Sequence, residues 1–251
     1  MQAVAKISLS IFHINIHQDA GNRIMHHAYA IRKLPENGDS LLTRKFAALN
    51  NEGVRSIFPG EAMIMQAPTL LASPKATQTI LRKLHCWICV APNANSGATT
   101  LEEGQWVGMY ALQGPLQPGQ SNYFDKDTPL TPNGSLWISR RMYIQEQHRN
   151  MEAMMGLHQA TEEHVRRHQQ TLGDGTGIVR VRFTSREGSA SFAMLSASTG
   201  HVAAVRPLAY RDLLEEDGTL AFLPAGLLDQ APEGTLETAW TLFEMRLDGL
   251  A

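Results

Sequence analysis

Two arginines and a tyrosine lie within one apolar segment of the sequence and could act on a carbonyl compound. Arg140, Arg141 and Tyr143 all fall inside Ser135 to Ile144, which has the composition of a strand. A guanidinium group can hold a carboxylate or carbonyl, and a phenol can polarise a carbonyl or donate a proton. Successive strand residues point to opposite faces, so we expect Arg140 and Arg141 on opposite faces. The same alternation predicts four side chains on one face: Trp137, Ser139, Arg141 and Tyr143.

Two further residues near this strand have side chains suited to proton transfer. Tyr110 lies on the preceding predicted strand and offers the same chemistry as Tyr143. His148 follows the strand where a helix begins, and the positive helix end should keep its imidazole neutral, able to act as a base or a donor. Each type of candidate also has a structural interpretation: the tyrosines as core residues, the histidine as a non-catalytic residue, and the arginines as partners of acids. The catalytic candidates are therefore Tyr143, Arg141, His148 and Tyr110.

Methionine and aromatic residues predict an adaptable apolar pocket. The chain has 11 methionines, several of them close together between Met151 and Met155. Methionine fills irregular cavities and adapts to large ligands, although ordinary core packing explains it equally well. His158 lies among these methionines and suits a core position. The substrate-binding candidates are Trp106, Trp137, Arg140, Met151, Met154, Met155 and His158.

The histidine and cysteine pairs do not predict a metal site. His164 and His168 are four residues apart on a predicted helix, but the charged residues around them favour a solvated face. Cys86 and Cys89 are the only cysteines, and an apolar strand-like run surrounds them. Residues three apart on a strand point to opposite faces, so their sulfurs should diverge. A zinc site would also need a second ligand pair. We expect structural cysteines and no bound metal.

Composition favours one ordinary globular domain. The chain has 251 residues, 43% of them apolar, with 22 basic and 24 acidic residues. Nothing in this balance suggests a nucleic-acid binder, which would need a basic stripe, and no run of about 18 apolar residues predicts a membrane span. Few cysteines and no recognisable targeting segment favour a cytoplasmic protein. We expect a single domain over residues 1–251, monomeric or homodimeric.

Hydrophobic patterns predict alternating strands and helices. Strands are expected at 5–16, 84–90, 105–112, 135–144, 178–183, 202–205 and 238–247, and helices at 41–49, 73–84, 149–171 and 189–198. Asp39 or Ser40 is the expected cap of the first helix. Long polar loops are expected at about 91–104 and 116–134, the second of them a candidate lid or binding loop. This order predicts an α/β (α+β) fold, a mixed sheet with helices on both faces.

Three segments, taken in order, resemble the GNAT superfamily of acyltransferases, and more closely its members in fungal small-molecule pathways. Gly104 to Pro115 is similar to the family's G-x-W-V-G…L-x-G-P strand. Trp137 to Arg149 is similar to its central strand and following turn, and Gly177 to Arg182 to its next parallel strand. The resemblance implies a twisted, mostly antiparallel sheet with two central parallel strands that splay apart. It also implies a cleft between these strands that receives an acyl thiol.

The chain departs from this family in the loop that holds the coenzyme A pyrophosphate. The family motif is Q/R-x-x-G-x-G/A, whose glycines let phosphates approach backbone N–H groups. Here the six residues run from Arg149 to Met154, with Glu152 and Met154 in the two glycine positions. A carboxylate there repels phosphate, so we expect weak or absent acetyl-CoA binding. If the cofactor binds nevertheless, the resemblance assigns its contacts to Ile144, Arg149 and Asn150.

These observations leave three functions open. The first is a cofactor-independent cyclase or isomerase, of the pericyclase type, that holds an apolar biosynthetic intermediate in the cleft. The second is an N- or O-acyltransferase that uses acetyl-CoA through a degenerate loop. The third is a non-catalytic ligand-binding protein. The first is the expectation from the lost glycines, with an apolar small molecule as partner, no nucleic acid and no membrane.

Overall fold

The described strands form one seven-stranded sheet. The computed structural model describes residues 29–37, 39–57, 74–116, 135–171, 179–186, 202–208 and 240–247, with Ala193 and Ser196. The strands are β1 (Ala30–Lys33), β2 (His85–Ala91), β3 (Gln105–Gln113), β4 (Ser135–Ile144), β5 (Val179–Arg186), β6 (Val202–Leu208) and β7 (Trp240–Arg246). Their spatial order is β1-β2-β3-β4-β5-β7-β6. Only the β4–β5 pair is parallel, so the sheet is mixed and mostly antiparallel, as predicted.

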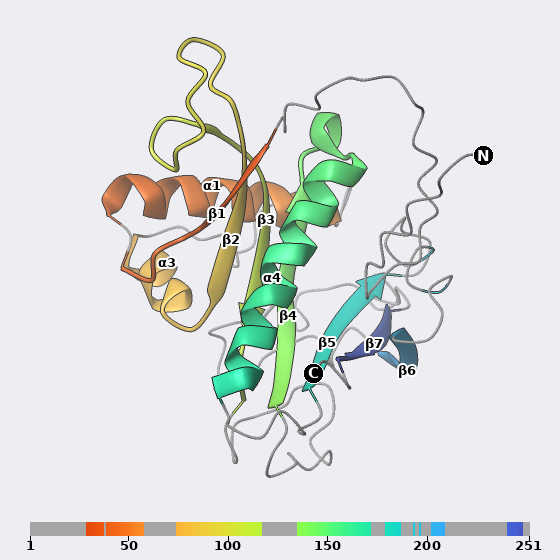
Figure 1. The fold of residues 1–251 in the computed structure, drawn as a ribbon. Coiled ribbons are helices and arrows are strands. Elements are labelled where there is room, and N and C mark those ends of the chain that lie inside the picture. Colours follow the sequence, from red (N-terminus) through yellow and green to blue (C-terminus); the bar gives the residue numbers. More distant parts are fainter. Residues whose placement is uncertain are drawn as a thin grey trace, which may run out of the picture.

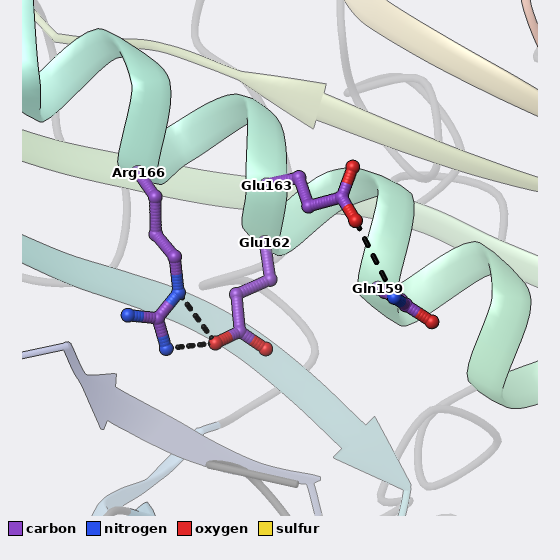
Figure 2. Close-up of polar contacts among 4 residues, drawn as sticks. All are labelled: Gln159, Glu162, Glu163 and Arg166. Carbon is purple, nitrogen blue, oxygen red and sulfur yellow. Dashed lines mark hydrogen bonds and ion pairs between the residues drawn. The ribbon is translucent and has the colours of Figure 1, made fainter. Parts of the chain in front are cut away.

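Local capping chemistry sets the starts of the helices. The described helices are α1 (Ser40–Ile57), α3 (Pro74–Leu81), the short 3-10 helix η1 (Glu146–His148) and α4 (Met151–Thr171). Asp39 caps α1, because its Oδ1 accepts the N–H groups of Leu41 and Leu42, each at 2.8 Å. Pro74 is the first residue of α3, where a missing N–H has no cost. Along α4, Arg166 donates to Glu162, and Gln159 donates to Glu163 (Figure 2).

Helices cover both faces of the sheet (Figure 1). On one face, called here the α4 side, Ala153, Leu157 and Val165 of α4 pack into a core with sheet residues such as Val107 and Trp137. On the other, the α1 side, helices α1 and α3 contribute the residues Leu42, Phe46, Leu49 and Leu81. Each side is buried, which explains why β2 and β3 have nearly continuous apolar sequences.

The predicted elements agree with the structure where it describes the chain. The strand predicted at 135–144 has those bounds, and the long helix ends at Thr171 as predicted but begins at Met151 rather than 149. The predicted strand at 5–16, most of the helix at 189–198 and residues 117–134 of the second loop lie outside the described residues. Cys86 belongs to the α1-side core and Cys89 to the α4-side core, so their side chains diverge as predicted.

In the described part of the chain, no helix combines the length and the apolar character that crossing a membrane requires.

Candidate functional site

The parallel strands β4 and β5 separate partway along their length. They pair over four positions, from Ser135 opposite Val179 to Ile138 opposite Arg182. Both strands then continue, β4 to Ile144 and β5 to Arg186, without pairing further with each other (Figure 1). We call the stretch in which these two strands do not pair with each other, 139–144 of β4 and 183–186 of β5, the splay. It is the separation that the family resemblance predicts.

A β-bulge in β4 lies at the start of the splay. Ala111 of β3 faces Arg141, and the next residue, Leu112, faces Ser139, so Arg140 is the extra residue. Ser139 hydrogen-bonds to Tyr110, which is in the α4-side core, whereas Tyr143 is in the α1-side core. The prediction that Trp137, Ser139, Arg141 and Tyr143 share one face is therefore wrong, because it assumed regular alternation through Arg140.

Arg140 is fixed by a neutral side chain. Its Nε and Nη2 donate to Oε1 of Gln113 at 2.7 and 2.6 Å, and the residue is 3% exposed. Gln113 follows Leu112, a member of the α4-side core, and by alternation it points to the α1 side. Arg140 therefore lies on the α1 side as well.

Arg141 reaches helix α1. Its Nε donates to Oδ1 of Asn50 at 3.1 Å, and its Nη1 donates to the carbonyl oxygen of Arg140 at 3.0 Å. Arg141 is half-buried. Both arginines thus lie on the α1 side, and the prediction that they point to opposite faces is wrong for the same reason, the bulge.

Tyr143 donates its hydroxyl hydrogen to a carboxylate rather than leaving it for a substrate. Its Oη donates to Glu52 Oε1 at 2.9 Å, and Gln145 Nε2 donates to Glu52 Oε2 at 2.9 Å. Burial and the Glu52 carboxylate raise the pKa of Tyr143 to about 12. In the structure the Tyr143 hydroxyl thus holds the Glu52 carboxylate, and the role of Tyr143 as a proton donor stays a prediction.

Asn50 and Glu52 are site residues that sequence reasoning missed. They lie 91 residues before their partners Arg141 and Tyr143, in a segment without a clear pattern. A cue existed at Gly53: a Cβ there would lie 2.9 Å from Tyr143 Cγ, so only glycine allows α1 this close to β4. Without a known partner strand, however, the glycine alone does not identify the contact.

A second group of polar residues lies on the α4 side. Tyr110 is buried beside Ser139, and burial raises the pKa of its hydroxyl. The ring of His158 on α4 meets Tyr110 edge-on, with centroids 5.4 Å apart. Burial lowers the pKa of His158 to about 4, so its imidazole is neutral at physiological pH. Tyr110 and His158, both predicted from the sequence, are thus brought together, on the opposite side of the sheet from Arg141.

The turn between β4 and α4 is held by Tyr29, another residue the sequence did not indicate. The Tyr29 hydroxyl lies 3.2 Å from His148 Nδ1 and accepts a hydrogen bond from Asn150 Nδ2 at 2.9 Å. Arg149 Nε donates to the carbonyl oxygen of Ile144 at 3.0 Å. His148 therefore stands at the turn with a hydroxyl partner, and Arg149 binds the end of β4.

The first turn of α4 has two outward and two inward side chains. Met151, 45% exposed, and Glu152 face solvent, whereas Ala153 is buried and Met154 packs against the α4-side core. Asn150 caps the helix, because its Oδ1 accepts the Ala153 N–H at 2.9 Å. The glutamate in the first glycine position is thus exposed, and the methionine in the second packs toward the sheet.

The predicted substrate pocket is not formed as one cluster. Trp106 lies in the α1-side core with its Nε1 donating to Leu101 O at 2.8 Å, and Trp137 lies in the α4-side core with its Nε1 donating to Ser135 Oγ at 3.0 Å. The sheet separates the two indoles. Met154 and Met155 are half-buried near His158, while Met151 is exposed.

His164 and His168 do not occupy a solvated face, contrary to the prediction. His164 packs against His85 and Trp87, with centroid distances of 4.6 and 5.1 Å, and His168 packs against Trp137 at 5.3 Å. Burial lowers the pKa of His164 to about 4. Among the residues that the structure describes, no three histidine, cysteine or acidic side chains are grouped to hold a metal ion.

Comparisons with known proteins give the fold and little more. No protein-family model matches the chain, and no curated protein matches it. It is similar to the crystal structure of Arabidopsis thaliana NAA60 in complex with a bisubstrate analogue, with 13% identity, a TM-score of 0.51, and coverage of 86% of this chain and 98% of that one. It is also similar to the crystal structure of Arabidopsis thaliana NAA60 in complex with acetyl-CoA, with 13% identity and a TM-score of 0.50. That match covers 88% of this chain and 99% of that one. The chain therefore shares the fold of these structures, the GNAT-like mixed sheet that the sequence resemblance implies.

Proposed function

We propose that this protein is an acyltransferase that takes its acyl group from a coenzyme A thioester, with the splay as the reaction site. The observation that carries the proposal is the exposure of Glu152. The sequence suggested that this carboxylate repels a pyrophosphate, but the side chain faces solvent at the start of α4.

The turn before α4 retains the features that favour an anion. The positive end of the 21-residue helix α4 is directed at this turn, and Arg149 lies beside it with its Nε on Ile144 O. Met154, in the second glycine position, packs inward against the α4-side core. Arg149, Asn150 and Ile144 are the residues that would hold the coenzyme, whose thioester would supply the acyl group.

The splay and the bulge support the same function. Beyond Ile138 the strands β4 and β5 no longer pair with each other, and we take this separation as the place where the acyl thioester would enter. The bulge at Arg140 turns Arg141 and Tyr143 together toward α1, where Asn50 and Glu52 meet them. In the solved structure of similar fold, NAA60 is in complex with acetyl-CoA.

One observation favours a second function, the cofactor-independent cyclisation or rearrangement of an apolar intermediate. The N–H of Ala153 is already bonded to Asn150 Oδ1, so a phosphate would have to displace that cap. Glu152 also places a negative charge in the first turn, which partly satisfies the helix dipole. In that function the splay would bind the intermediate with no coenzyme present.

Calorimetric titration of the protein with acetyl-CoA separates the two functions. Acyl transfer predicts saturable binding in the micromolar range, weakened by Arg149→Ala but not by the matched variant Arg167→Ala, whose Nε also donates to a backbone carbonyl. No binding at millimolar concentration would overturn the acyltransferase proposal and leave the cofactor-independent one. Release of free thiol in the presence of candidate acceptors then distinguishes catalysis from ligand binding alone.

A further inference from the structure

We propose that Tyr29 fixes the proton of the His148 imidazole on Nε2, so that His148 acts as a hydrogen-bond donor to the phosphates of the coenzyme and not as a base. Tyr29 is then a positioning residue, because it acts through His148. The identity of the ligand rests on the proposed function, whereas the position of the proton on the imidazole does not.

The direction of the hydrogen bonds around Tyr29 is set by Asn150, the cap of α4. Asn150 Oδ1 accepts the backbone N–H of Ala153 at 2.9 Å, and a backbone N–H can only donate. This bond determines which end of the amide is the oxygen, so the other end, Nδ2, carries the hydrogens. Asn150 Nδ2 donates to the Tyr29 hydroxyl at 2.9 Å, and the hydroxyl oxygen is therefore the acceptor in that contact.

The hydrogen of the Tyr29 hydroxyl is thus available for His148. The Tyr29 Oη lies 3.2 Å from His148 Nδ1. In the part of the chain that the structure describes, Asn150 and His148 are the hydrogen-bond partners of this hydroxyl. If Nδ1 carried the proton, it would also donate to the hydroxyl, and the hydroxyl hydrogen would have no acceptor among these residues. The proton therefore belongs on Nε2, with the lone pair of Nδ1 facing Tyr29.

The Nε2–H of His148 is the donor that this arrangement leaves for a ligand. His148 is half-buried, and its Nε2 makes no hydrogen bond to the described residues. The backbone of the turn is fixed as well, because the Asn150 N–H donates to the carbonyl oxygen of His148 at 2.9 Å. A nitrogen that already carries its proton cannot accept another, so the arrangement favours the donor over the base, the two roles that the sequence left open.

A side-chain donor at this turn compensates for a backbone donor that α4 uses in its own cap. The Ala153 N–H is bonded to Asn150, so a phosphate could reach it only by displacing the cap. His148 lies two residues before Asn150 and directly before Arg149. A phosphate that accepts from His148 Nε2–H can bind at the turn with the cap in place.

The position of the proton can be measured by long-range 1H–15N correlation NMR on the full chain. Spectra are recorded at about pH 9, where an ordinary imidazole is neutral, and the His148 signals are those missing in His148→Gln. We expect a protonated Nε2 and an Nδ1 that accepts a hydrogen bond. In Tyr29→Phe the Nδ1 shift should move toward that of a free imidazole. A proton on Nδ1 in the wild type, or an Nδ1 shift unchanged in Tyr29→Phe, would overturn the proposal.

Asn150→Asp should reverse the direction of these hydrogen bonds. Both oxygens of an aspartate accept, so one can still cap the helix at Ala153 while the other takes the hydrogen of the Tyr29 hydroxyl. The Tyr29 oxygen then accepts from His148, whose proton moves from Nε2 to Nδ1. Asn95→Asp, an exposed substitution between β2 and β3, is the control for added charge and should leave the proton on Nε2. A proton that stays on Nε2 in Asn150→Asp would contradict the inferred direction.

The role of His148 as a donor is tested with two replacements that each retain one nitrogen position. The side-chain nitrogen of a glutamine lies near the position of Nε2, and that of an asparagine near the position of Nδ1. In calorimetric titration, His148→Gln should bind acetyl-CoA within about threefold of the wild type, and His148→Asn roughly tenfold more weakly. Equal affinities of the two variants, both folded as judged by their melting temperatures, would overturn the donor role.

These measurements separate the proposal from the proposed function. If acetyl-CoA does not bind to the wild type, the acyltransferase function fails together with the assigned ligand, while the NMR spectra still decide whether Tyr29 fixes the proton. If acetyl-CoA binds equally to the wild type and to His148→Asn, acyl transfer stands and the donor role of His148 does not.

Discussion

Gly53 of α1 lies against Tyr143 of β4 with no room for a side chain. A Cβ at position 53 would lie 2.9 Å from Tyr143 Cγ and 3.0 Å from its Cβ. The Tyr143 Cβ is fixed by the backbone and does not move with the rotamer, and Cγ belongs to a ring that is packed in the α1-side core. This contact brings Asn50 and Glu52 within reach of Arg141 and Tyr143. The close approach of α1 to β4 therefore builds the α1 side of the candidate site.

Gly53→Ala should destabilise the protein although alanine favours a helix. The gain in helix propensity is about 1 kcal/mol, and the clash with Tyr143 should exceed it, for a net loss of roughly 1–2 kcal/mol in the free energy of unfolding. Gly156→Ala in α4 is the matched control, because its Cβ would meet Ile31 Cγ1 at 2.9 Å and Cδ1 at 3.2 Å, two atoms that rotation about χ1 can move, and not a Cβ fixed by the backbone. Urea titration should place Gly53→Ala clearly below Gly156→Ala, and the reverse order would contradict this reading of the contact.

Much of the fold could be predicted from the sequence because each strand carries its own pattern. The run from Ser135 to Ile144 is apolar at its start and bounded by polar loops, and the strand has those bounds. The orientation of Arg141 and Tyr143 could not be predicted, since a bulge depends on the register with β3 and leaves no mark on β4 alone. One extra residue exchanged the faces of every side chain that follows it.

The orientation of His164 and His168 on α4 could not be predicted from the sequence either. The residues around His164 and His168 are charged, which favours a solvated face, but the helix turns both rings onto Trp137 and its neighbours. Glu163 and Arg167, which alternate with these histidines along α4, are exposed. Helical periodicity distinguishes the two faces only when the position of the sheet is known.

Stability should fall between pH 7 and pH 5. Burial holds the pKa of His158 and His164 at about 4, against an ordinary value of about 6.5. Above pH 6.5 neither the folded nor the unfolded state binds these protons. As the pH falls from 6.5 toward 4, the unfolded state binds protons that the folded state does not, so folding becomes less favourable.

Melting temperatures measured at pH 7, 6 and 5 check this expectation, in a range where ordinary carboxylates remain ionised. His164→Gln should reduce the difference in melting temperature between pH 7 and pH 5, because the glutamine does not titrate. A pH dependence unchanged in both His164→Gln and His158→Gln would show that other groups are responsible.

The two cysteines should be unreactive in the folded protein. Cys86 is 1% exposed and Cys89 is fully buried, and burial raises the pKa of both thiols to about 12. The thiolate, which is the reactive form, is therefore a negligible fraction at pH 8. Iodoacetamide followed by mass spectrometry should show no modification of the native protein and two modifications in concentrated guanidinium chloride. A native intramolecular disulfide would contradict the placement of the two sulfurs on opposite faces.

Replacing Glu152 should have opposite effects on coenzyme binding and on stability. Glu152→Gln removes a negative charge from the first turn of α4, which should tighten acetyl-CoA binding about two- to fivefold if the pyrophosphate binds there. The same change removes a favourable interaction with the helix dipole and should lower the free energy of unfolding by about 0.5 kcal/mol. Glu163→Gln is the control, because Glu163 is also exposed and accepts an amide hydrogen from Gln159, but farther along α4 (Figure 2).

Calorimetric titration of the three proteins should show tighter binding for Glu152→Gln alone. Equal affinities would mean that the Glu152 carboxylate does not act on the coenzyme phosphates.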